Sequence, residues 1–192
     1  ESYFWQFCDD YIELVKNRAY GTPDEQGHVP SEKAVKSART ALGLGLDAFA
    51  RLLAPYLPYA TEEVWSWMHA GSGSVHRAAW PVVDPYVEAA TGASPELLTW
   101  AGKAVEQLRK IKSEAKVSMK TPILSVALSA AADGVDAIHA ALGDIAQAGR
   151  VVGKFDLVAK HAEESAAEDA PETEVAVEAS ELGEPPAKKP KH

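Results

Sequence analysis

Cysteine is nearly absent from this chain of 192 residues, since Cys8 is the only one. A single thiol excludes a disulfide framework and any zinc site built from cysteines. The six histidines never stand four residues apart, and none lies beside a glutamate in the spacing of a metalloprotease motif. We therefore expect no metal site in this sequence.

Long apolar runs are missing as well. No window approaches the ~18 uncharged apolar residues of a membrane span, and the first residues lack the basic-then-apolar order of a secretion signal. We expect a cytoplasmic protein without a membrane segment. A glycine-rich phosphate loop is also absent, because Gly43-Leu44-Gly45 lies inside a helical pattern and no lysine follows at the required distance. Nucleotide binding has no support in the sequence.

What the chain does contain is helical periodicity, with apolar side chains recurring every three or four residues. The predicted helices cover residues 3–20, 31–54, 60–69 and 94–115. Ser31 is the predicted cap of the second helix, and Pro55 and Pro58 end it. The first helical pattern is already in progress at Tyr3 without a cap before it, so we expect a piece of a longer chain.

The pattern changes beyond Pro122. Alternating apolar residues predict strands at 123–128 and 151–158 with a helix at 135–147 between them, which is a β-α-β arrangement. From His161 onward the chain is rich in Glu, Ala and Pro, and its low apolar content predicts a disordered acidic tail. The predicted fold class is mainly α, and the predicted domains are a helical bundle at 1–117, a small α/β subdomain at 118–160 and the tail at 161–192.

A formal net charge of −9 hides one basic stretch between residues 101 and 120. Its cations are Lys103, Arg109, Lys110, Lys112, Lys116 and Lys120. Helical spacing predicts that Arg109, Lys112 and Lys116 form one stripe on the polar face of the fourth helix. A concentrated positive face suits a polyanion, because each phosphate contact releases counterions. A merely solvated face explains the charge equally well.

Two short motifs resemble a known family. Residues 53–65 (LAPYLPYATEEVW) and 74–81 (SVHRAAWP) resemble, in this order and spacing, two signatures of the anticodon-binding domains of class I aminoacyl-tRNA synthetases. Within that class, residues 7–18 and 112–122 are similar to the corresponding segments of valyl-tRNA synthetases. The resemblance covers residues 2–158 and implies a helical bundle, truncated at its N-terminus, that holds the anticodon stem and loop of valine tRNA, tRNA(Val).

The resemblance also separates candidate contacts from structural residues. The basic residues that we expect to contact the tRNA are Lys36, Arg39, Arg109, Lys112 and Lys116. The motif residues that we expect to serve the fold are Pro55, Pro58, Glu62, Glu63, Trp65, His76 and Trp80. The prolines are predicted to set the turn, the two glutamates to lie in the first turn of the next helix, the tryptophans to be core or joint residues, and His76 to hydrogen-bond locally.

Catalysis is not expected from this chain alone. It contains neither the HIGH nor the KMSKS motif with which class I synthetases bind and activate ATP, and it is too short for their catalytic and editing domains. The resemblance implies a parent enzyme that uses ATP with Mg²⁺ to join valine to tRNA(Val), while this piece has no catalytic residue and no cofactor. The alternative hypothesis is a free-standing, non-catalytic RNA-binding module derived from such a synthetase.

Overall fold

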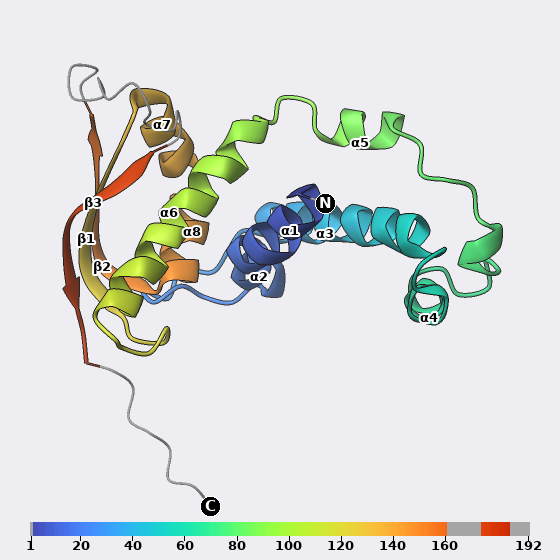
Figure 1. Ribbon diagram of the computed structural model, residues 1–192, viewed down its shortest axis with the longest axis horizontal. Coiled ribbons are helices and arrows are strands. Elements are labelled where there is room, and N and C mark those ends of the chain that lie inside the picture. Colours follow the sequence, from blue (N-terminus) through green and yellow to red (C-terminus); the bar gives the residue numbers. More distant parts are fainter. Residues whose placement is uncertain (1, 161–173, 185–192) are drawn as a thin grey trace, which may run out of the picture. The chain divides into compact units, whose positions relative to one another are not determined.

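The computed structural model describes residues 2–160 and 174–184. The chain divides into two compact units, which we name the sheet unit (1–30 and 94–192) and the helical unit (31–93). Helices predominate, and a small three-stranded sheet lies in the sheet unit, which confirms the predicted fold class (Figure 1). Within the described residues, none of the helices combines the length and apolar character needed to cross a bilayer.

The sheet unit begins with one continuous helical segment, as predicted for residues 3–20. Its parts are α1 (Ser2–Trp5), a π-helical stretch (Gln6–Tyr11) and α2 (Ile12–Tyr20). Leu14 and Val15 are the buried residues of α2. Gly21 ends the helix with a φ of 69°, a left-handed conformation that suits glycine at this position.

The long helix α6 (Pro95–Glu114) supplies much of the core of the sheet unit. Its buried apolar residues are Trp100, Ala101, Ala104, Val105, Leu108 and Ile111, in agreement with the predicted periodicity. Two glycines let neighbouring helices approach it closely. A Cβ atom added at Gly134 would lie 2.6 Å from the ring of Trp100, and one added at Gly149 would overlap Cδ1 of Leu108.

The predicted β-α-β arrangement is confirmed. Strands β1 (Ile123–Ala130) and β2 (Val151–Ala159) pair in parallel, and α7 (Ala132–Ala140) and α8 (Leu142–Gly149) connect them. The single helix predicted at 135–147 is therefore two helices. Helices α6, α7 and α8 lie on one side of the sheet, as Figure 1 shows.

A third strand corrects the predicted tail. Strand β3 (Val175–Leu182) pairs antiparallel with β1 and gives the order β2-β1-β3, so disorder was the wrong prediction for this stretch. Ordering this acidic stretch costs conformational entropy. The hydrogen bonds between the backbones of β3 and β1, together with the burial of Val175, offset that cost. The rest of the predicted tail, 161–173 and 185–192, lies outside the described residues. The compact units group α6 with the sheet, whereas the boundary predicted at residue 117 assigns it to the bundle.

The helical unit contains α3 (Glu32–Leu53), α4 (Pro58–Met68), a 3₁₀ turn (Val75–Arg77) and α5 (Asp84–Ala89). The cap predicted at Ser31 is confirmed, because its Oγ accepts a hydrogen bond from the backbone N–H of Ala34 at 3.2 Å. The small core of this unit consists of Ala50, Ala54, Trp65 and Val75.

Candidate nucleic-acid interface

A groove of about 580 Å³ lies within the sheet unit, where α2, α6, the end of α8 and two loops meet. We name it the basic groove, because its lining contains five cations and three acids on a chain of net charge −9. The cations are Lys16, Arg109, Lys112, Lys120 and Arg150, and the acids are Glu13, Asp24 and Glu25. The excess of positive charge suits an anionic ligand.

Two of these cations are already paired. Nζ of Lys16 lies 2.6 Å from Oε2 of Glu13, and Nη2 of Arg150 lies 3.1 Å from Oε1 of Glu25. Both pairs are substantially exposed, so each contributes little stability and can be exchanged for a phosphate at small cost. Arg109 and Lys120 form no ion pair with any described residue and are exposed. They are the groove cations most available to a phosphate.

Lys112 departs from the predicted exposed stripe. Its side chain is buried, with a residue exposure of 2%, and Nζ donates hydrogen bonds to the carbonyl oxygens of Met119 at 3.0 Å and Gly149 at 2.8 Å. Burial lowers the pKa of Lys112 to about 8, and the charge of Arg150 acts in the same direction. The predicted place of Lys112 in an exposed stripe is therefore wrong.

The physical reason lies in the helical period. Lys112 follows the buried Leu108 by four residues and therefore shares its side of α6. The charge of Lys112 predicts exposure, whereas its i+4 relation to Leu108 predicts burial. Lys116 does not continue the stripe either, because it lies beyond the end of α6 with a φ of 54°. It is exposed, and its backbone N–H donates to Ser113 O at 3.0 Å.

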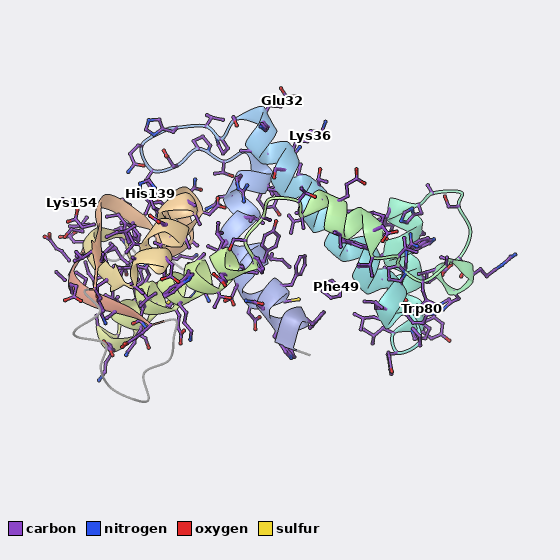
Figure 2. All side chains as sticks on the ribbon, turned by 90° about the horizontal axis from the view of Figure 1, so that it is seen from above. Glu32, Lys36, Phe49, Trp80, His139 and Lys154 are labelled. Carbon is purple, nitrogen blue, oxygen red and sulfur yellow. The ribbon has the colours of Figure 1, made fainter. Side chains whose placement is uncertain are left out.

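The other two candidate cations belong to the helical unit. Lys36 and Arg39 are exposed on α3, and the side chain of Lys36 projects away from the ribbon in Figure 2. Lys36 and Lys33 line a shallow hollow of about 340 Å³. The structure thus brings Arg109 together with Lys120 and Arg150 in one groove, and places Lys36 and Arg39 in a different unit. Lys120 belongs to the predicted basic stretch but not to the predicted contacts, and Arg150 belongs to neither, because its position depends on the end of α8.

Most motif residues serve the fold as expected. Pro55 lies in the turn after α3, and Pro58 is the first residue of α4, so the turn predicted from the two prolines is confirmed. Trp65 is buried, and its Nε1 donates to Gly73 O at 3.0 Å. His76 hydrogen-bonds locally, as predicted, since its Nε2 lies 3.2 Å from Pro58 O.

Three motif residues require correction. Because α4 begins at Pro58, Glu62 and Glu63 lie beyond its first turn. Glu62 instead accepts hydrogen bonds from Ser74 Oγ at 2.8 Å and the backbone N–H of Val75 at 3.1 Å, which holds the loop after α4. Trp80 is 62% exposed, so of its two predicted roles, core or joint residue, the core role is wrong. Nη1 of Arg51 donates a hydrogen bond to the carbonyl oxygen of the adjacent Ala79 at 3.0 Å.

The chemistry available at the basic groove is therefore recognition by charge. In the part of the chain that the structure describes, no three His, Cys, Asp or Glu residues gather as metal ligands. The groove combines exposed guanidinium and ammonium groups with walls fixed by three helices. Such a surface can neutralise and orient phosphates.

Comparisons with known proteins agree with this chemistry. Residues 1–128 match the family described as the anticodon-binding domain of tRNA ligase. The valine–tRNA ligase of Bifidobacterium longum subsp. infantis is 97% identical over 192 residues, which are 100% of this chain and 21% of that protein. The valine–tRNA ligase of Salinispora tropica is 44% identical over 165 residues, covering 79% of this chain and 18% of its own length. That of Cutibacterium acnes is 41% identical over 191 residues, covering 100% and 19%. The chain thus spans about a fifth of the length of the curated relatives it matches.

Proposed function

The chain belongs to the anticodon-binding domain family of tRNA ligases, and from that premise we propose that it provides anticodon-side RNA contacts for a valine–tRNA ligase. The observation that carries this proposal is the basic groove, whose unpaired cations Arg109 and Lys120 lie beside the exposed Arg150 pair. The relatives that match 79% to 100% of this chain are valine–tRNA ligases. The RNA ligand we propose is the anticodon stem and loop of tRNA(Val).

Phosphates and bases make different demands on such a surface. Cations that neutralise phosphates position an RNA and release its counterions, whereas contacts to unstacked bases carry the sequence preference. The basic groove meets the first demand through Arg109, Lys120 and Arg150. We assign Lys36 and Arg39 of α3 a second set of phosphate contacts, because both are exposed on a helix.

We propose that the chemical steps belong to other parts of such a ligase. The chain spans about a fifth of its relatives and contains neither the HIGH nor the KMSKS sequence. ATP with Mg²⁺ would accordingly act outside this chain, in the formation of valyl-tRNA. The proposed location of this reaction is the cytoplasm.

The test measures how the affinity of the 192-residue chain for a tRNA(Val) anticodon stem–loop depends on salt. In the variant R109Q/K120Q we expect weaker binding and a salt slope smaller by about 1 per removed phosphate contact, over about 50 to 200 mM salt. The matched control is K103Q/K154Q, which removes the same charge from two cations that lie outside the groove and are paired with Glu106 and Asp156.

Three outcomes are distinguishable. A smaller slope in R109Q/K120Q together with an unchanged slope in K103Q/K154Q supports the groove as the phosphate site. Equal losses in both variants would reduce the effect to overall charge and overturn the site. If the wild-type chain binds a stem–loop with a different anticodon equally well, the chain is a general RNA-binding module and the proposed tRNA(Val) preference is wrong.

A further inference from the structure

The buried ammonium group of Lys112 has an unusual set of partners. Both of its hydrogen-bond acceptors are neutral backbone carbonyls, Met119 O at 3.0 Å and Gly149 O at 2.8 Å, and it forms no ion pair within the described residues. Burying a charge without an opposite charge is costly, and an apolar side chain of similar size would fill the space with less penalty. The reason for a lysine at this position therefore lies in the two carbonyls that it holds.

The two acceptors share a feature that supplies such a reason. The carbonyl of Met119 belongs to the peptide bond that continues into Lys120, and the carbonyl of Gly149 belongs to the peptide bond that continues into Arg150. Both following residues are cations that line the basic groove. Nζ of Lys112 thus holds the backbone immediately before each of these two cations.

The same ammonium group ties both backbone positions to α6. Gly149 is the last residue of α8, where helical carbonyls lack internal partners and a cation is favoured by the helix dipole. Arg150 follows with a φ of 53°, a conformation that non-glycine residues rarely adopt and that a fixed Gly149 carbonyl helps to maintain. Arg109, the third groove cation, lies three residues before Lys112 on α6.

We propose that Lys112 is a positioning residue that sets the spacing of Arg109, Lys120 and Arg150 for RNA phosphates without touching the RNA itself. The inference rests on the proposed function of the basic groove. Holding the three cations in place before binding reduces the ordering cost that the RNA would otherwise have to offset. It also explains why Lys112 is buried at 2% exposure while the other four cations of the groove are not buried.

The decisive experiment is a double-mutant cycle on binding of the tRNA(Val) anticodon stem–loop. K112M removes both hydrogen bonds, and K120Q/R150Q removes the two groove cations that they hold. In the wild-type background we expect K120Q/R150Q to weaken binding about tenfold, since two phosphate contacts are lost. In the K112M background the same two substitutions, K120Q/R150Q, should weaken binding about threefold or less, because the two cations are already displaced.

A merely structural role would not produce this coupling. If K120Q/R150Q costs the same in both backgrounds, with both proteins folded by circular dichroism, the positioning role is overturned. The control K110M makes the same change on an exposed neighbour in α6 that does not line the basic groove. In the K110M background we therefore expect K120Q/R150Q to weaken binding as strongly as it does in the wild type. If R109Q/K120Q fails to weaken binding at all, the proposed function fails first, so the two failures are distinguishable.

A measurement on the wild-type chain keeps the proposal testable if K112M does not fold. In the NMR spectrum of the lysine ammonium groups, titration with the stem–loop should shift the Nζ signal of Lys120. The Nζ signal of Lys112 should retain its position and its slow exchange with solvent, because its partners are carbonyls inside the protein. A shift of Lys112 as large as that of Lys120 would indicate direct contact with the RNA and overturn the proposal.

Discussion

Thr121 is fully buried just before β1, and its hydroxyl Oγ1 has no hydrogen-bond partner among the described residues. A buried hydroxyl without a partner costs free energy, whereas valine has nearly the same shape and no polar group. We expect T121V to raise the free energy of unfolding by about 1 kcal/mol. Urea unfolding followed by circular dichroism measures the change.

Thr61 is the matched control for this prediction. It is also buried, but its Oγ1 donates to Leu57 O at 2.9 Å. T61V removes that hydrogen bond to Leu57 O, so we expect the free energy of unfolding to fall by about 1 kcal/mol. Changes of the same sign in T121V and T61V would contradict the assignment of an unsatisfied hydroxyl to Thr121.

Lys112 makes the stability of the chain depend on pH. Burial lowers its pKa from the ordinary value of 10.5 to about 8, so the folded chain releases this proton at lower pH than the unfolded chain does. Between these two values the unfolded state binds more protons, and the free energy of unfolding therefore rises with pH. Arg150 is the neighbouring charge that acts in the same direction.

The measurement compares wild type with K112M at several pH values. We expect the stability of wild type relative to K112M to increase as pH rises from about 8 to about 10.5, by at most about 3 kcal/mol. Groups that titrate identically in both proteins contribute equally to the two free energies of unfolding, so their contributions cancel in the difference. Parallel stability curves for the two proteins would show that Lys112 titrates normally.

At the scale of elements, the close approach of α7 to α6 depends on Gly134. A Cβ atom there would lie 2.6 Å from the ring of Trp100, which is fully buried. We expect G134A to lower the free energy of unfolding by about 2 kcal/mol, because overpacking in a core costs about 1 to 3 kcal/mol. Urea unfolding of the variant gives the value directly.

Gly143 provides the control on the next helix. It lies in α8 with nothing within 4 Å of an added Cβ atom. G143A should therefore raise stability by about 0.5 to 1 kcal/mol through helix propensity alone. If G134A were as favourable as G143A, the contact between α6 and α7 would be looser than the structure shows.

The elements differ in how far they could be predicted from sequence. The buried stripe of α6 follows from its period, because every fourth residue returns to the same face. Strand β3 could not be predicted, since its order depends on pairing with the distant β1 and its local composition is that of a solvated segment. The division of residues 135–147 into α7 and α8 at Ala141 has no proline or glycine signal at that residue.

The candidate site could be predicted only in part from the sequence. Arg109 and Lys116 are exposed as expected from the polar face of the basic stretch. The charge of Lys112 predicts a surface position, although its spacing from Leu108 places it on the buried side. The position of Arg150 in the groove follows from the end of α8 against α6, a tertiary contact that no local pattern contains.

At the scale of the whole molecule, the chain has two cores of very different content. The helical unit buries Ala38, Ala50, Ala54, Trp65 and Val75. The sheet unit buries many large side chains, among them Leu14, Trp100, Leu108, Ile123 and Ile138. Because hydrophobic stabilisation grows with the apolar area buried, the helical unit should be the less stable of the two.

We therefore expect the two units to unfold separately, with the helical unit unfolding at the lower urea concentration. Trp65 and Trp100 are buried reporters of the helical and the sheet unit, and labelling the wild-type chain with 5-fluorotryptophan gives each a ¹⁹F NMR signal without mutation. The native signal of Trp65 should disappear before that of Trp100. Coincident loss of the two signals would mean one cooperative transition, so that contacts beyond the two separate cores determine the stability of the helical unit.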